Sequence, residues 1–202
     1  MERTIDELNL ISYEDYFSKM PISKKQKADR VKAAQEFEDI FLYFISMLDL
    51  ENSYGTEQKS VKDFIAQYTK AVSKYNSNDN FIALYVALIA SEVAEATLRH
   101  IGEKYYTSLS RAQILAANEA NSVLNQTDFD NAIASGYKRK QWLTEMDDKV
   151  RPTHIELEGK TIPINDLFVV GSAIMRFPHD YEMASGHPEE LASCRCGITY
   201  LR

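Results

Sequence analysis

The sequence predicts an α+β protein, with a helical N-terminal portion followed by a small domain that holds a helix and short antiparallel strands. Apolar residues recur at helical spacing from about residue 12 to residue 125. Most of the prolines lie after Gly136, where the apolar runs become short and turn residues interrupt them. We therefore expect a helical region over residues 1–107 and a second domain over residues 108–202.

Four to six helices account for the periodicity of the first part. Ser23 and Gln26 have the spacing of a capping box, in which each side chain bonds the backbone N–H of the other residue, so a helix is expected to begin there. The other expected helix starts are Thr56 or Glu57 after the breaker Gly55, Asn78 or Asp79, and Ser108 or Ser110. The Phe and Tyr residues on these helices are interpreted as the core of a helical bundle.

The longest apolar stretch, residues 81–90, is about half of the roughly 20 residues that a membrane-spanning helix needs. It is therefore interpreted as a buried helix, and no membrane partner is expected. The N-terminus has no apolar block after a basic start, so a secretory signal is not expected either.

Composition and charge narrow the function classes. The chain has 202 residues, 45% of them hydrophobic and 26% charged, which is typical of a globular protein. The net charge of -7 disfavours general binding to a nucleic-acid backbone. The two cysteines, Cys194 and Cys196, are separated by one residue, so a disulfide between them would be strained. Reduced thiols, and assembly in a cytoplasm, are expected instead.

After Gly136 the pattern favours strands. Residues 155–157 and 161–164 flank Glu158-Gly159-Lys160, which is typical of a hairpin turn with glycine at a positive φ. Residues 196–201 are expected to form a closing strand. Residues 168–192 would then be a long loop with little regular structure, which is unusual in a compact domain.

One ordered set of residues spans the C-terminal half. It begins at Lys140-Gln141-Trp142-Leu143-Thr144 and ends at Cys194-Arg195-Cys196. From about residue 109 to the C-terminus, this set resembles the phage Mu F-like family of minor head (head morphogenesis) proteins. The residues that carry the resemblance are Trp142, Asp147, Arg151, His154, Gly159, Phe168, Pro178, Asp180, Cys194, Arg195 and Cys196. The chain departs from the family pattern at Ser193, Lys149 and His179, where asparagine, arginine and glycine are usual.

The resemblance implies a phage minor head protein, encoded by a phage or a prophage, that acts in head morphogenesis. Such a protein associates with the portal protein and other head proteins, lies inside the virion, and assembles in the host cytoplasm. The resemblance further allows contact with packaged DNA. It implies no catalytic residues and no enzymatic turnover.

His154, Cys194 and Cys196 form a candidate metal site. Alternate residues of a strand face the same side, so both sulfurs would point together if the last strand extends to Cys194. Zinc favours nitrogen and sulfur donors in a tetrahedral arrangement, and a fourth donor would come from His179, Asp180 or His187. The simpler interpretation is that these residues pack and hydrogen-bond in the core, as Trp142 is expected to do.

A basic run, Lys138, Arg139 and Lys140, lies beside Tyr137 and is the candidate DNA contact, although three neighbouring charges are more often a solvated face. Asp147 and Arg151 are expected to pair with each other or with the backbone.

The competing function is a small zinc-dependent hydrolase or toxin-like enzyme using His154 and the two cysteines. Its further candidate groups are Glu156, His179, Asp180 and His187. The sequence holds no His-Glu-x-x-His, no phosphate-binding glycine loop and no Gly-x-Ser-x-Gly that would support an enzyme.

Overall fold

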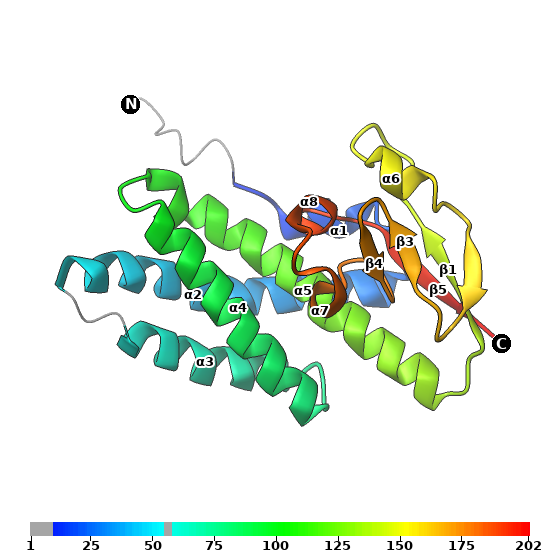
Figure 1. Ribbon diagram of the computed structural model, residues 1–202, viewed down its shortest axis with the longest axis horizontal. Helices are drawn as coiled ribbons and strands as arrows, with labels where there is room; N and C mark the ends of the chain where they lie inside the picture. The colour runs from blue at the N-terminus through cyan, green and yellow to red at the C-terminus, as the bar shows by residue number, and fades with distance from the viewer. Residues whose placement is uncertain (1–9, 55–57) are drawn as a thin grey trace. The chain divides into compact units, whose positions relative to one another are not determined.

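The computed structural model describes residues 10–54 and 58–202, which divide into two compact units. Unit 1 comprises the described residues of Met1–Tyr13 and Lys32–Glu119, and unit 2 comprises Glu14–Val31 and Ala120–Arg202. Two long helices, α2 (Lys24–Tyr54) and α5 (Leu109–Ala134), contribute residues to both units. Figure 1 shows helices followed by short antiparallel strands, so the α+β class is confirmed. The domain boundary after residue 107 stays a prediction.

Unit 1 is helical and has an aromatic core. Besides its parts of α2 and α5 it holds α3 (Gln58–Val72), α4 (Asp79–Arg99) and the short 3-10 helix η2 (Lys104–Thr107). The rings of Phe44 and Phe64 stack with their centroids 4.2 Å apart, and Phe41 lies 5.3 Å from both Phe64 and Tyr68. These rings are buried, which confirms the interpretation of the aromatic stripes as core.

Helix α4 contains the longest apolar stretch of the chain. By length and composition alone this helix is apolar enough to cross a membrane. Its inner face is nevertheless buried, as expected of a core helix, through Ile82, Tyr85, Val86, Ile89, Ala90, Val93, Ala94 and Thr97. Asn78 caps the helix, because its side chain accepts a hydrogen bond of 3.1 Å from the N–H of Phe81.

Two further helix starts follow the sequence signals. The N–H of Ser23 donates to Oε1 of Gln26 at 3.0 Å and the N–H of Gln26 donates to Oγ of Ser23 at 3.3 Å, which confirms the capping box at α2. Ser108 caps α5, since its Oγ accepts the N–H of Arg111 at 3.2 Å. The start predicted at Gly55, Thr56 or Glu57 lies outside the described residues.

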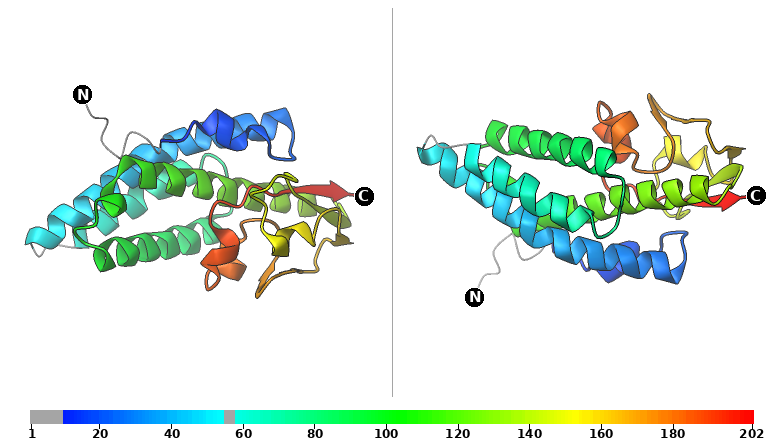
Figure 2. Two further views of the ribbon diagram at one scale, coloured as in Figure 1. Left: turned by 90° about the horizontal axis from the view of Figure 1, so that it is seen from above. Right: turned by 90° about the horizontal axis from the view of Figure 1, so that it is seen from below.

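Unit 2 contains all the strands of the described chain. Its short elements are α1 (Tyr13–Ser18), β1 (Arg139–Leu143), α6 (Pro152–Ile155), β2 (Thr161–Pro163), β3 (Phe168–Val170), β4 (Ala173–Met175), α7 (Tyr181–Ala184), α8 (Pro188–Leu191) and β5 (Gly197–Leu201). Strand β1 pairs antiparallel with β2 on one side and β5 on the other, while β3 and β4 form a separate hairpin. Figure 2 shows these elements from two opposite sides.

Three sequence predictions about unit 2 need correction or refinement. Residues 155–157 are not a strand, because Pro152 begins helix α6 and the chain turns from there to Gly159. The partner of β2 is therefore β1, although Gly159 does have the predicted positive φ, at +70°. Residues 168–192 are not an irregular loop, since they hold β3, β4, α7 and α8. Elements of three or four residues are too short to show a period in the sequence.

The closing strand is confirmed from Gly197 onward. The core of unit 2 gathers around Trp142, which is fully buried on β1 as predicted, although its indole N–H has no hydrogen-bond partner among the described residues. Its indole meets the ring of Phe168 edge to face at 5.2 Å and the ring of His154 at 5.7 Å. The tryptophan thus connects the sheet to the β3–β4 hairpin and to α6.

Candidate functional site

Three side chains of unit 2 bring nitrogen and sulfur atoms together. Nδ1 of His154, on α6, lies 3.4 Å from Sγ of Cys196 and 3.5 Å from Sγ of Cys194. All three residues are buried, and their ligand atoms lie within 4.8 Å of one another. The structure therefore places the three predicted metal-site residues in one cluster.

The backbone before β5 sets the positions of the two cysteines. Strand β5 begins only at Gly197, so strand alternation does not orient the sulfurs as the sequence suggested. Instead, Ser193 has a φ of +54°, and the side-chain amide of Asn121 donates to the carbonyl of Cys194 at 3.0 Å. Gly197 allows a close approach of the chain, because a Cβ there would lie 2.8 Å from Cγ2 of Ile22 and would displace it.

Glu190 holds the other side of the histidine ring, a contact that the sequence analysis missed. Oε2 of Glu190 lies 3.1 Å from Nε2 of His154 and accepts a hydrogen bond from Thr153 at 2.8 Å. Gly171 leaves room for this carboxylate, since a Cβ at Gly171 would overlap it. A carboxylate on Nε2 keeps a proton there, so in the neutral ring Nδ1 presents its lone pair to the sulfurs.

The three groups shift one another's protonation. Hydrogen bonds from Cys196 and then His154 hold the pKa of the Cys194 thiol well below its usual value. The hydrogen bond to Cys194, followed by burial, raises the pKa of Cys196. Burial alone would lower the pKa of His154, but the contacts with Cys194 and the charge of Glu190 raise it. The sulfur pair thus loses its first proton readily and its second with difficulty.

The cluster borders an open pocket. Its lining residues are Glu145, Lys149, Val150, Arg151, His154, Ser193, Cys194, Arg195 and Cys196. Arg195 forms ion pairs with Glu145 at 2.5 Å and with Asp147 at 3.1 Å. Burial raises the pKa of Glu145 to about 7 despite the nearby Arg195. The pocket therefore has a cationic rim beside one buried carboxyl group.

None of the three predicted fourth donors joins the cluster. Asp180 is engaged by Arg176, whose Nε and Nη2 donate to its two carboxylate oxygens at 2.8 Å each. His187 is partly exposed and contacts Ser172 at 2.9 Å. His179 is buried, and its Nδ1 lies 2.7 Å from Oγ of Ser122.

His179 still differs from the other two candidates. Within residues 10–54 and 58–202, its Nε2 is buried and has no hydrogen-bond partner. Burial lowers the pKa of His179 to about 4, so the ring is neutral at pH 7. Glu156, a further candidate for the hydrolase interpretation, is exposed on the surface.

The remaining motif residues have structural partners. The sequence analysis expected Asp147 and Arg151 to pair either with each other or with the backbone, and they do not pair with each other. Asp147 accepts the N–H of Lys149 at 3.0 Å and pairs with Arg195, while Arg151 donates to the backbone carbonyl of Ala192. The carbonyl of Pro178 accepts the side-chain amide of Asn125 at 2.6 Å. These contacts lie within unit 2.

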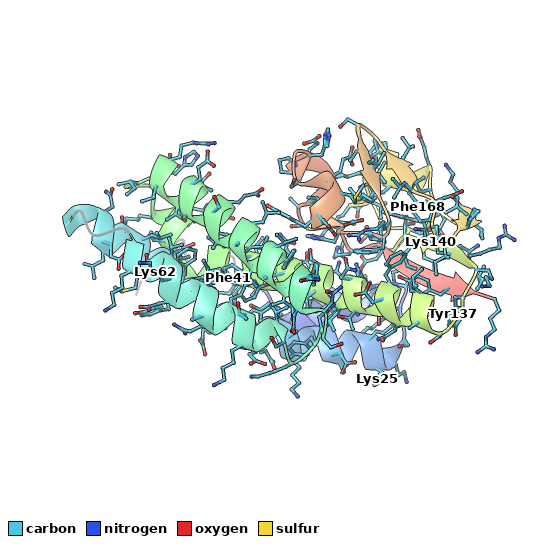
Figure 3. The ribbon with its side chains drawn as sticks, turned by 60° about the horizontal axis from the view of Figure 1, so that its bottom comes forward. Lys25, Phe41, Lys62, Tyr137, Lys140 and Phe168 are labelled. Carbon is cyan, nitrogen blue, oxygen red and sulfur yellow. The ribbon has the colours of Figure 1, made fainter. Side chains whose placement is uncertain are left out.

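The predicted DNA-contact run does not act as one surface. Lys138 and Arg139 are exposed, but Lys140 is buried with its ammonium 5.1 Å from the centroid of the Phe129 ring and 5.5 Å from that of Phe168. Figure 3 shows Lys140 beside Phe168. Alternation along β1 puts Lys140 on the same face as Trp142, which is a signal that was present in the sequence. Lys140 is therefore corrected to a core residue, and DNA contact stays a prediction for Lys138 and Arg139.

Comparison with known proteins identifies the family. The family described as "Phage Mu protein F like protein" matches residues 61–199, which begins well before the resemblance found from residue 109 onward. The NAD(+)–arginine ADP-ribosyltransferase EFV of Enterococcus faecalis is 27% identical over 142 residues, which cover 68% of this chain and 28% of that protein. No solved structure matches. Because the family match covers more than half of the chain, the chain belongs to the phage Mu protein F-like family of phage head proteins.

Proposed function

We propose that this chain is a minor head protein that acts in head morphogenesis by binding the portal protein and other head proteins. It would lie inside the virion and assemble in the host cytoplasm. The observation that supports this proposal is the family match over residues 61–199, which includes most of unit 2 and much of unit 1. The proposed role consists of protein contacts, without enzymatic turnover.

The β3–β4 hairpin offers a surface for such a contact. Val169 and Ile174 lie directly opposite each other in the hairpin and are 62% and 43% exposed. Neighbouring apolar side chains on a surface favour protein binding more than isolated ones do. We expect this pair to contact the portal protein.

The test is co-purification with the portal protein encoded by the same phage. Wild-type chain should be retained on tagged portal protein, and the double variant Val169→Glu and Ile174→Glu should lose most of this binding. The matched control is Leu84→Glu, which changes an apolar side chain of unit 1 that is 73% exposed and should not affect retention. Failure of the wild type to bind portal protein, alone or within heads, would refute the proposal.

A second candidate is the small zinc-dependent hydrolase or toxin-like enzyme. The specific observation in its favour is the chain of contacts from Cys194 through His154 to Glu190 beside an open pocket. Such an order of nucleophile, base and orienting carboxylate occurs in cysteine enzymes. The ADP-ribosyltransferase relative is a further reason for a direct test, although the present chain spans only 28% of its length.

Incubation of the zinc-supplemented chain with NAD(+), arginine and model ester or peptide substrates distinguishes the two candidates. We expect no consumption of NAD(+) and no hydrolysis above the level of a Cys194→Ser variant. Turnover that this variant abolishes would establish the enzyme instead.

A further inference from the structure

We propose that Nδ1 of His154 and the sulfurs of Cys194 and Cys196 bind one zinc ion, whose fourth coordination position faces the pocket. This proposal does not depend on the role in head assembly. It rests on the distances within the cluster, on the orientation of the histidine, and on the pocket that all three residues line.

The distances fit a tetrahedral site. With zinc–nitrogen and zinc–sulfur bonds of about 2.0 and 2.3 Å, a nitrogen and a sulfur bound to the same ion lie roughly 3.6 Å apart. The separations from Nδ1 of His154 to the two sulfurs are 3.4 and 3.5 Å. With the two sulfurs no more than 4.8 Å apart, these separations are compatible with one ion bound by all three atoms.

The orientation of His154 is that of a metal ligand. Its Nε2 meets the buried carboxylate of Glu190, so its Nδ1 presents a lone pair to the sulfurs. Metal-bound histidines usually donate their other ring N–H to a carboxylate or carbonyl, which fixes the tautomer and strengthens the bond to the ion. Glu190 is assigned this positioning role.

The number of sulfurs favours a metal over a catalytic cysteine. A catalytic cysteine needs one thiol on the histidine, whereas here two sulfurs lie at nearly equal distances from the same nitrogen. A metal ion uses all three atoms at once.

The fourth position is assigned to the pocket because no fourth protein donor meets the cluster within the described part of the chain. Asp180 and His187 are engaged elsewhere, and His179 lies outside the group of three. Sites with three protein donors keep an exchangeable water or another ligand on the ion. Lys149 and Arg151 also line the pocket, and their charges favour an anion there, whereas Arg195 is paired with Glu145 and Asp147.

The first test measures metal content. The full chain, expressed with added zinc and purified without a metal-binding tag, should contain close to one zinc ion per chain by mass spectrometry. Cys194→Ser, Cys196→Ser and His154→Ala should lose most of it, whereas the control His187→Ala should keep it. Folded wild-type protein that contains no zinc, and takes up none on dialysis, would overturn the proposal.

A second test avoids variants of buried residues, which can fail to fold. Cobalt should replace zinc in the wild-type chain and produce the absorption of a four-coordinate ion with bonds from two thiolates. A spectrum without thiolate-to-cobalt bands would overturn the ligand set. Glu190→Gln should weaken zinc binding by about 10- to 100-fold, the usual effect of removing an orienting partner, and an unchanged affinity would remove that role.

The open fourth position has its own test. Added cyanide should shift the cobalt bands of the wild type, because it replaces the exchangeable ligand. His179→Ala should leave the starting spectrum unchanged. A spectrum that is insensitive to cyanide but altered in His179→Ala would identify His179 as the fourth ligand and overturn the open position.

Discussion

Unit 1 buries aromatic rings of α2 and α3 against one another, whereas unit 2 buries the side chains of Lys140, His154 and His179 as well as that of Trp142. Long helices supply wide apolar faces, so buried apolar area supplies much of the stabilisation of unit 1. Unit 2 consists of strands of three to five residues and helices of four to six, besides its parts of α2 and α5, and offers less continuous apolar surface. Specific polar contacts therefore supply a larger share of the stabilisation of unit 2.

Both units also bury charged groups, among them Arg111 and Glu119 in unit 1. In unit 2, Arg30 is fully buried and donates to Oδ1 of Asn121 at 2.9 Å and to Oδ1 of Asn125 at 2.6 Å. Both asparagines also hold the backbone near the candidate site, at Cys194 and Pro178. Unit 1 should therefore respond most to lost volume, and unit 2 to lost partners.

The largest effect is expected in unit 1. Phe41→Ala removes a fully buried ring that packs on Phe64 and Tyr68, and should lower the free energy of unfolding by about 3–5 kcal/mol. Urea denaturation followed by far-ultraviolet circular dichroism measures this change. Tyr43→Ala, on the exposed side of the same helix, is the control and should cost less than about 1 kcal/mol. If Phe41→Ala and Tyr43→Ala lower the free energy of unfolding equally, the aromatic core is contradicted.

The second prediction concerns a buried carboxyl group of unit 1. Burial raises the pKa of Glu119 to about 7, although hydrogen bonds from Tyr85 and Tyr68 partly oppose the shift. Because the folded-state pKa exceeds the unfolded value, this group stabilises the protein below about pH 4.5. That stabilisation is lost as the pH rises through about 7, and amounts to about 3 kcal/mol.

Glu119→Gln removes this titration and keeps an oxygen that accepts hydrogen bonds. Relative to the variant, the wild type should therefore lose about 3 kcal/mol of stability between pH 4.5 and pH 8. Urea denaturation of both proteins at several pH values measures the difference. The comparison cancels the contributions of other groups to the pH dependence of stability. One of these is His179, whose lowered pKa makes the folded protein more stable as the pH rises. If the free energies of unfolding of the two proteins change in parallel with pH, the raised pKa of Glu119 is contradicted.

The third prediction concerns a polar contact of unit 2. Asp180→Asn weakens three hydrogen bonds from Arg176, from its N–H, Nε and Nη2, and should cost about 2 kcal/mol. Trp142, the only tryptophan in the sequence, reports the unfolding of unit 2 by its fluorescence. The control Glu182→Gln alters a partner of the same arginine that is 55% exposed, so it should cost less than about 1 kcal/mol. If Glu182→Gln destabilises the protein more than Asp180→Asn does, the greater importance of the buried partner of Arg176 is contradicted.

The smallest expected effect is the loss of a helix cap in unit 1. Asn78→Ala removes the side-chain bond to the N–H of Phe81 and should destabilise the protein by about 1 kcal/mol. Thermal unfolding followed by circular dichroism is sensitive enough to measure it. Ser77→Ala, at the preceding exposed position, should have almost no effect. If both variants unfold alike, the cap contributes nothing.

The candidate site shows how far sequence reasoning extends. His154, Cys194 and Cys196 were identified from residue type and from an ordered motif, and the structure brings them together. Glu190 was not identified, because no spacing connects it to His154, which lies 36 positions away in the chain. The fourth donors were proposed by residue type alone, and their actual partners, such as Arg176 for Asp180, depend on packing.

By itself, the sequence determined the α+β class, the capping box at Ser23, two further helix starts to within two residues, and the family. Each of these depends on local spacing or on the order of residues along the chain, which a sequence records directly. Only the tertiary structure decided that β1 is the partner of β2 and that Glu190 orients His154. These features arise from contacts between distant residues and from elements too short to show a period, so the folded packing alone specifies them.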